Sequence, residues 1–341
     1  MEKLLRIRDL SVSFGSGNSE VKAVTSASLE IEKGQIVALV GESGSGKSVT
    51  ALSVTRLLPY PLAWHPSGSI KFDGQEIMGA PETEMRVLRG NRISMIFQEP
   101  LNSLNPLHSL EKQITEVLHL HKKVSGVEAR KRVKEILDLV GMSEVNSRLH
   151  AMPHEFSGGQ QQRIMIAMAL ANEPELLIAD EPTTALDVTV QAQVLKLLKE
   201  LTERLNMGLL LITHDLGIVR KMAQHVYVMH DGRLVENNET ENLFTSPSHE
   251  YTRHLLAAEP SGKPDSVPDD AQDVLTAKDV KVWFPVKRGV IRRTVGHIKA
   301  VDGISLHLRE CHTLGVVGES GSGKSTLGRA LLRLETSMGV I

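Results

Sequence analysis

Two identical eight-residue segments contain the residue types that bind phosphate groups. Residues 41–48 and residues 318–325 both read GESGSGKS, in which three glycines are separated by glutamate and serine residues and are followed by lysine and serine. Glycines allow consecutive backbone N–H groups to turn toward an anion, and a helix that begins at the lysine presents the positive end of its dipole. We expect Lys47 to bridge the β- and γ-phosphates of a nucleotide and the Ser48 hydroxyl to ligate Mg²⁺.

Short apolar runs separated by helical patterns predict the scaffold for these loops. Residues 36–40, 176–179 and 209–213 are apolar runs bounded by turns or polar residues, as in strands buried on both faces. Such strands alternating with helices indicate an α/β domain with a parallel sheet covered on both sides. Residues 107–147 have helical periodicity and predict a helical insert beside the sheet.

An acidic pair follows one of the predicted strands. Asp180 and Glu181 come directly after Leu176–Ala179, so they should lie at the carboxyl edge of the sheet, beside the glycine loop. We expect Asp180 to order Mg²⁺, usually through water, and Glu181 to polarise the attacking water.

A second helix start has the composition of an anion site. Ser157, Gly158, Gly159 and Gln160 precede the apolar helical run that ends near Pro174. One nucleotide seldom needs two phosphate sites in the same domain. We therefore expect this helix start to face a nucleotide that is held by a partner domain, packed head to tail.

The repeated glycine loop belongs to a longer internal repeat. Ala23-Val24 aligns with Ala300-Val301, Ser28-Leu29 with Ser305-Leu306, and Val40 with Val317. Residues 259–273 contain three prolines and several acids without an apolar period, which is typical of a flexible linker. We therefore expect a complete domain at 1–258, a linker at 259–273, and at 274–341 the first part of a second, truncated copy that ends after its glycine-loop helix.

Composition excludes several other classes of protein. Lys and Arg total 39 against 41 Asp and Glu, and there are only 2 Trp, 3 Tyr and 6 Phe, which disfavours nucleic-acid binding. Cys311 is the single cysteine, so an internal disulfide and a cysteine-held metal cluster are excluded. The longest apolar run, Ile164–Ala171, is too short to span a bilayer. We expect a soluble protein of a reducing compartment.

Across residues 1–258 these motifs, in this order, resemble those of ATP-binding-cassette (ABC) nucleotide-binding domains. The resemblance implies a P-loop NTPase fold with a central, mostly parallel sheet, an antiparallel β subdomain and a helical subdomain at about 99–160. It also implies ATP and Mg²⁺ as ligands and ATP hydrolysis as the activity.

The resemblance assigns expected roles residue by residue. Phe14 resembles the aromatic residue that stacks on adenine, and the Walker A segment would contact phosphate through Gly41, Glu42, Ser43, Gly44, Ser45, Gly46, Lys47, Ser48 and Val49. Gln98 resembles the glutamine-loop residue that senses Mg²⁺ and the γ-phosphate. Ser157–Gln160 resemble the ABC signature, although Phe156 stands where leucine is commoner.

The remaining motifs have counterparts as well. Residues 176–180 resemble Walker B with Glu181 as the catalytic glutamate, Ala185–Asp187 resemble the D-loop, and His214 resembles the switch histidine. Ser48, Gln98, Asp180 and, in the second copy, Ser325 would be metal ligands. The second loop would contact a nucleotide through Gly318, Gly321, Gly323, Lys324, Ser325 and Thr326.

Two passages narrow the resemblance within that superfamily. Residues 98–106, QEPLNSLNP, and residues 246–252, SPSHEYT, resemble the dipeptide, oligopeptide and nickel importers. The start of the second copy resembles their partner ATPase subunit, as in fused two-cassette importers such as those of the microcin C type. This implies two transmembrane permease subunits, a periplasmic substrate-binding protein and a second ABC domain as partners, with no nucleic acid. It also implies a peripheral position on the cytoplasmic face of the inner membrane, with residues 98–122 facing the permeases.

Three alternatives remain open. A soluble twin-cassette ATPase acting on ribosomes would share the duplication but usually has a long, charged helical linker. A chromosome-maintenance ATPase would need a coiled coil between Ser48 and Ser157, where no sustained heptad repeat occurs. An inactive truncated fragment is the third alternative.

Overall fold

The computed structural model describes residues 3–98, 103–183, 186–258, 262, 268, 270–288, 293–319 and 321–341. The chain divides into two compact units, residues 1–186 with 190–259 and residues 260–341 with 187–189. Most of the predicted linker at 259–273 lies outside the described residues.

The centre of the first unit is a six-stranded sheet in the order β10-β9-β3-β8-β7-β6, in which only β10 is antiparallel to its neighbour. Its strands are β3 (Ile36–Val40), β6 (Ile93–Ile96), β7 (Leu176–Asp180), β8 (Gly208–Ile212), β9 (His225–His230) and β10 (Arg233–Glu239). All residues of β3, β7 and β8 are buried. The predicted parallel sheet, covered on both faces, is thereby confirmed.

Alternate residues of this sheet enter two different cores. Ala38 and Leu211 pack with the helices of one face, whereas Val37 and Leu210 pack toward the other. Among the described residues, the helices of residues 1–258 are α1 (Lys47–Thr55), α2 (Glu82–Leu88), α4 (Leu110–Lys122), α5 (Gly126–Leu139), α6 (Gly158–Leu170), α7 (Val188–Leu205), α8 (Leu216–Met222), α9 (Thr240–Thr245) and α10 (Glu250–Ala257). Short 3₁₀ turns occur at Gly17–Ser19, Ser143–Ser147 and Pro153–Glu155.

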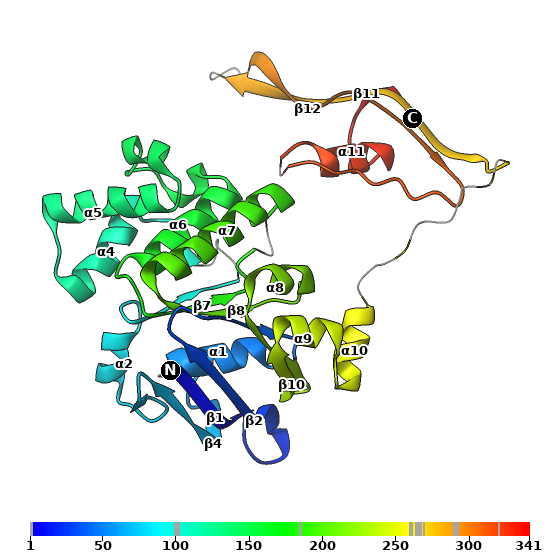
Figure 1. Cartoon of the computed structure of the whole chain (residues 1–341). Helices are drawn as coiled ribbons and strands as arrows, with labels where there is room; N and C mark the ends of the chain where they lie inside the picture. The colour runs from blue at the N-terminus through cyan, green and yellow to red at the C-terminus, as the bar shows by residue number, and fades with distance from the viewer. Residues whose placement is uncertain are drawn as a thin grey trace. The chain divides into compact units, whose positions relative to one another are not determined.

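The second core lies between the central sheet and a four-stranded antiparallel sheet. That sheet has the order β2-β1-β4-β5, from β1 (Lys3–Phe14), β2 (Val21–Glu32), β4 (Ala63–Phe72) and β5 (Gln75–Glu76). Ala51 and Val54 of α1 are buried in this core, so the helix that follows the glycine loop is held between the two sheets (Figure 1). This is the antiparallel β subdomain that the motif order implied.

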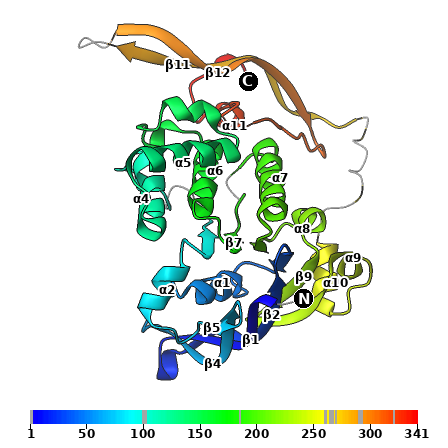
Figure 2. The ribbon, with the colours of Figure 1, turned by 60° about the vertical axis from the view of Figure 1, so that its left-hand side comes forward.

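Helices α4, α5 and α6 pack against one another on the side of the central sheet that faces away from the antiparallel sheet (Figure 2). Ile114 and Leu118 of α4, Val133 and Leu137 of α5 and Ile164 of α6 are buried in the first core. The predicted helical subdomain is therefore present, with its helices amphipathic at the expected spacing.

The second unit is smaller. β11 (Asp273–Arg288), β12 (Arg293–Arg309) and β13 (Met338–Val340) form an antiparallel sheet, and α11 (Lys324–Leu331) packs on it. Its core contains Val280, Val282, Val301 and Leu327 among its buried residues. Val317, whose counterpart Val40 is buried in the first copy, is 92% exposed.

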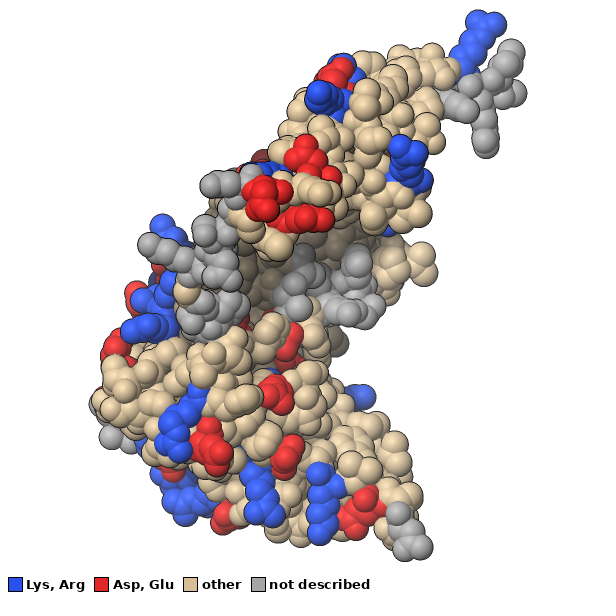
Figure 3. Space-filling view, turned by 90° about the vertical axis from the view of Figure 1, so that its right-hand side faces the viewer, with Lys and Arg blue, Asp and Glu red and all other residues tan. Residues whose placement is uncertain are grey.

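None of the helices among the described residues has both the length and the apolar character needed to cross a bilayer. On the face drawn in Figure 3, basic and acidic side chains are interspersed.

Candidate functional site

The first glycine loop joins β3 to α1 at the carboxyl edge of the central sheet. Gly41 has a φ of 150° and Gly46 a φ of 103°, both in the range that favours glycine. A Cβ atom on Gly41 would lie 2.0 Å from the carbonyl oxygen of Met229, and one on Gly46 would lie 2.7 Å from that of Ala23. Glycine is therefore required at both positions by the backbone of β9 and β2.

Lys47 begins α1 and is only 6% exposed. Its Nζ donates to the carbonyl oxygens of Gly41 (2.8 Å) and Glu42 (2.6 Å) and to Ser45 Oγ (3.3 Å). Burial lowers the pKa of Lys47, while the nearby charges of Glu181, Asp180 and Glu42 act in the opposite direction. The amine is thus held in the concavity of the loop, surrounded by acceptors, where a phosphate oxygen could bind it.

Asp180 and Ser48 form a pair whose chemistry suits Mg²⁺. Asp180 ends β7, is 6% exposed, and its Oδ1 has no hydrogen-bond partner among the described residues. Burial raises the pKa of Asp180, a hydrogen bond from Ser48 lowers it, and the charge of Glu181 raises it. A buried carboxylate oxygen with unused acceptor capacity, next to a hydroxyl, is an oxygen set of the kind that Mg²⁺ prefers. The residues present therefore fit this ion.

Glu181 forms hydrogen bonds with Gln98 and His214, the two other residues expected to take part in hydrolysis. Gln98 Nε2 donates to Glu181 Oε2 at 2.9 Å, and His214 Nδ1 lies 3.2 Å from Glu181 Oε1. The three side chains come from the ends of β6, β7 and β8, which are neighbours in the sheet. Glu181 has a φ of 46°, and its N–H donates to the carbonyl of Ile212 at 2.9 Å. A non-glycine residue in this region is strained and is held there by its surroundings.

The predicted second anion site is the start of α6. Ser157 caps the helix, since its Oγ accepts from the N–H of Gln160 (3.3 Å) while Gln160 Oε1 accepts from the N–H of Ser157 (3.0 Å). Ser157 and Gly158 are exposed, and the space where a Cβ of Gly158 would lie is open. A Cβ on Gly159 would meet Val190 Cγ1 at 2.7 Å. Within the described residues, no hydrogen bond or ion pair joins this helix start to the glycine loop of the same unit.

Phe14 ends β1 in the antiparallel sheet, where it is half-buried and pairs with Val21 of β2. β2 also contains Ala23 and Val24, the residues against which Gly46 packs. The strand pair that holds Phe14 therefore lies directly against the glycine loop.

Several other predicted residues are accounted for as follows. Ser43 and Gly44 are exposed at the tip of the loop, and Val49 is half-buried against the second core. Asp187 directly precedes α7. Ala185 of the D-loop, and Glu99 and Pro100 after Gln98, lie outside the described residues.

At its described glycines, the second glycine loop has the same backbone conformation as the first. Gly318, Gly321 and Gly323 have φ values of 157°, 79° and 93°, and Lys324 Nζ donates to the carbonyls of Gly318 and Glu319, each at 2.7 Å. A Cβ on Gly323 would meet the carbonyl oxygen of Ala300, just as Gly46 meets that of Ala23. Ser325 and Thr326 follow in the first turn of α11.

The surroundings of the second loop differ from those of the first. Cys311 has a φ of 59°, a conformation that Gly34 supplies in the first copy with a φ of 73°. A side chain therefore stands at a turn that favours glycine.

Sequence reasoning missed the contacts that hold the first loop from outside. Tyr251 Oη accepts from the N–H of Glu42 at 3.1 Å, and the N–H of Gly232 donates to the carbonyl of Ser45 at 3.0 Å. Tyr251 lies within the SPSHEYT passage, but it is 209 positions from Glu42. The sequence contains no local signal that would pair residues so far apart.

Comparison with known proteins agrees with this geometry. The profile of the ABC transporter family matches residues 24–184 and again residues 301–341. The peptidoglycan transport ATP-binding protein YejF of Agrobacterium fabrum is 58% identical over 340 residues, covering 100% of this chain and 62% of that protein. The oligopeptide transport ATP-binding protein OppD of Bacillus subtilis is 48% identical over 259 residues, covering 76% of this chain and 72% of that protein.

The fold also matches a solved structure. The dimeric ATP-binding cassette MJ0796, in a post-hydrolysis state with ADP and Pi, superposes with a TM-score of 0.62 at 28% identity. The match covers 69% of this chain and 98% of that one. The chain spans about three fifths of the length of the curated relatives that match it end to end. With the motifs, the sheet order and both profile matches in agreement, the chain belongs to the ABC transporter family.

Proposed function

We propose that the chain is the ATP-binding and ATP-hydrolysing part of an importer for peptides. Support comes from two relatives whose names describe transport of peptidoglycan and of oligopeptides, two cargoes that contain peptide. A peptide of the microcin C type is a narrower cargo that the fused two-cassette resemblance favours. Two permease subunits, a periplasmic substrate-binding protein and the cytoplasmic face of the inner membrane complete this proposal.

The observation that carries the proposal is the hydrogen-bonded group of Gln98, Glu181 and His214 near Lys47. Glu181 can accept a proton from a water molecule while the oxygen of that water attacks the γ-phosphorus of ATP. The products are ADP and inorganic phosphate. His214 and Gln98 hold one carboxylate oxygen each, so that the carboxylate is oriented before the substrate arrives. Lys47 and the loop amides bind the phosphate oxygens, and Mg²⁺ held by Ser48 and Asp180 would neutralise part of their charge.

A second cassette would complete the site. The start of α6 is exposed and is not bonded to its own glycine loop within the described residues, which suits contact with a nucleotide held by another cassette. The dimeric state of the solved cassette MJ0796 supports this arrangement. The partner would be a second copy of this chain or an intact fused cassette. Nucleotide binding would close the pair, and hydrolysis would reopen it and drive alternating access in the permeases.

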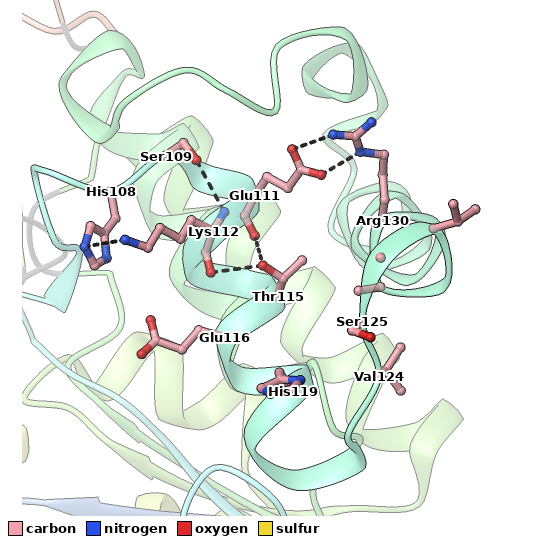
Figure 4. A pocket seen from close by; sticks show the side chains of 13 residues that line it. His108, Ser109, Glu111, Lys112, Thr115, Glu116, His119, Val124, Ser125 and Arg130 are labelled. Atoms are coloured by element: carbon pink, nitrogen blue, oxygen red, sulfur yellow. Dashed lines mark hydrogen bonds and ion pairs between the residues drawn. The ribbon is translucent and has the colours of Figure 1, made fainter.

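The helical subdomain offers a surface for the permeases. A groove of about 1000 Å³ lies between α4 and α5, and residues of the predicted 98–122 contact region line one side of it (Figure 4). Glu111 and Arg130 form an ion pair across the groove, and Lys112 Nζ lies 2.9 Å from His108 Nε2. Val127 is 88% exposed at the edge. Mixed charge beside exposed apolar surface suits the amphipathic helix of a membrane partner.

Replacement of Glu181 tests the proposal. Glu181→Gln should bind Mg²⁺-ATP with near-normal affinity, yet release phosphate about 10²- to 10³-fold more slowly, because the amide cannot accept the proton of the attacking water. Lys47→Ala should lose nucleotide binding itself. Equilibrium binding and phosphate release by the purified chain are the measurements.

The matched control changes a glutamate at the other end of the same strand. Glu175 precedes β7 and pairs with Arg92 and Lys33, away from the glycine loop. Glu175→Gln should therefore retain the wild-type rate. Normal hydrolysis by Glu181→Gln would remove Glu181 from the proposed role.

A further inference from the structure

The segment that follows the central sheet reaches back to the glycine loop. Tyr251, on α10, is 8% exposed, and its Oη accepts the N–H of Glu42, the second residue of the loop, at 3.1 Å. Its ring stacks on His230 at the end of β9, with centroids 3.8 Å apart and planes 20° from parallel. The ring of Tyr251 is therefore held in place by stacking, and its hydroxyl oxygen is free to accept the hydrogen bond from the loop.

A buried carboxylate fixes the residues that precede Tyr251. Glu236 of β10 is 7% exposed, and its Oε1 accepts from both the N–H and the hydroxyl of Ser248, each at 2.8 Å. Its Oε2 accepts from the N–H of His249 at 2.9 Å, and His249 in turn caps α10 by accepting the N–H of Tyr251 at 3.1 Å. Hydrogen bonds to a charged acceptor are the stronger kind, so this end of α10 is firmly placed.

The same loop is held at a second point by the turn between β9 and β10. The N–H of Gly232 donates to the carbonyl of Ser45 (3.0 Å), and the carbonyl of Gly232 accepts from the N–H of Thr25 (2.7 Å). Glu42 and Ser45 bracket Ser43 and Gly44, which are exposed at the tip. Two hydrogen bonds from outside the loop, at Glu42 and at Ser45, therefore orient its backbone. The loop's own N–H groups must point toward an anion, so this orientation matters for binding.

We propose that Tyr251 is a positioning residue for the glycine loop, anchored by Glu236, and that it preorganises the loop for triphosphate without touching the nucleotide. This proposal rests on the proposed ATP-binding function. Because the glycine loop would already be ordered before nucleotide binds, the conformational entropy lost in ordering it would not reduce the affinity for nucleotide. Loss of the phenol oxygen should weaken binding and leave the chemical step, which depends on Glu181, nearly unchanged.

The test compares two tyrosines in similar settings. Tyr227 is also 8% exposed, and its Oη likewise accepts a glutamate N–H at 3.1 Å, but that glutamate is Glu30 on β2. In the full chain, Tyr251→Phe should raise the KM for Mg²⁺-ATP about 3- to 10-fold, the ratio expected for one hydrogen bond, with kcat within about twofold. Tyr227→Phe should leave both values unchanged.

Amide hydrogen exchange without nucleotide gives a readout that does not depend on hydrolysis. Tyr251→Phe should speed exchange across residues 42–46, and Tyr227→Phe should not. Equal exchange and equal KM in the two variants would overturn the proposal. If the wild-type chain bound no Mg²⁺-ATP, the proposed function would fail, and the exchange comparison would still decide whether Tyr251 orders the loop.

Glu236→Gln tests the anchor. If Glu236 acts through Tyr251, this variant should show the same rise in KM and in loop exchange, and the double variant with Tyr251→Phe should show no larger effect than the stronger single one. If the rise in KM of the double variant equalled the product of the two single-variant rises, Glu236 would not act through Tyr251.

Discussion

At the scale of single residues, Asp180 illustrates a conflict between stability and chemistry. Burial raises the pKa of its carboxyl, and only the hydrogen bond from Ser48 and the charge of Lys47 oppose that rise. Its Oδ1 has no protein partner among the described residues. A charge that is buried and incompletely bonded costs stability, and it is retained here at the position where a cation would compensate it.

Removal of this charge should stabilise the nucleotide-free protein. An aspartate whose folded pKa lies above its unfolded value weakens the fold as pH rises through that interval, and the full penalty is present at neutral pH. Asp180→Asn should therefore raise Tm at pH 8, by about 2–4 °C for each kcal/mol recovered, and the gain should shrink as pH falls toward about 4. Thermal unfolding in EDTA at both pH values measures this.

The same variant should bind ATP equally well with and without Mg²⁺, whereas the wild-type chain should bind more tightly with the metal. Asp138→Asn, a substitution on the exposed face of α5, is the control for a general effect of charge. A lower Tm for Asp180→Asn at pH 8 would contradict the account of its burial.

At the scale of elements, the start of α6 has two roles that substitutions can separate. The Ser157 hydroxyl caps the helix through the N–H of Gln160, and the same exposed end would face a partner's nucleotide. A cap requires an acceptor, whereas a phosphate contact requires that no negative charge stand in the way.

Ser157→Asp should keep the first role and lose the second. Aspartate caps helices as well as serine, so Tm should stay within about 1 °C, while hydrolysis should fall at least about tenfold because the carboxylate repels phosphate. Ser157→Ala should instead lower stability by about 1 kcal/mol. Thermal unfolding and phosphate release, measured on both variants, distinguish the two effects. Unimpaired hydrolysis by Ser157→Asp would argue against a signature role for this helix end.

At the scale of the whole molecule, the proposed site needs parts from two cassettes. The first unit contains its own glycine loop, acidic pair and histidine, but the start of α6, where the signature is expected, has no hydrogen bond or ion pair to them within the described residues. When this chain is studied by itself, a second copy of it is the partner that we propose would supply the other helix start.

Activity should therefore depend on concentration. Phosphate released per molecule should fall steeply when the chain is diluted from micromolar to nanomolar concentration at saturating Mg²⁺-ATP, because the pair dissociates. Glu181→Gln, which should hold ATP without hydrolysing it, should move the chain to the size of a dimer in gel filtration with ATP. A constant specific activity over this dilution would contradict an intermolecular site.

Local pattern was sufficient for much of the fold. The apolar runs at 36–40 and 176–179 predicted β3 and most of β7, because a strand buried on both faces is largely apolar; Asp180, the last residue of β7, is buried and charged. The order strand, glycine loop, helix predicted the backbone around Lys47, because only glycine allows the turns that this loop requires. These features depend on neighbours in the sequence, and the sequence alone determined them.

Other features depend on which strands become neighbours. The meeting of Gln98, Glu181 and His214 follows from the order β6-β7-β8, which residue types do not encode locally and for which the family resemblance supplied the expectation. The support of the loop by Met229, Gly232 and Tyr251 was not foreseen at all. Tyr251 meets Glu42 only because β9 pairs with β3 and because α10 is held by Glu236 of β10. Only the tertiary structure decided these contacts, since their geometry is set by sheet register and packing across about two hundred residues.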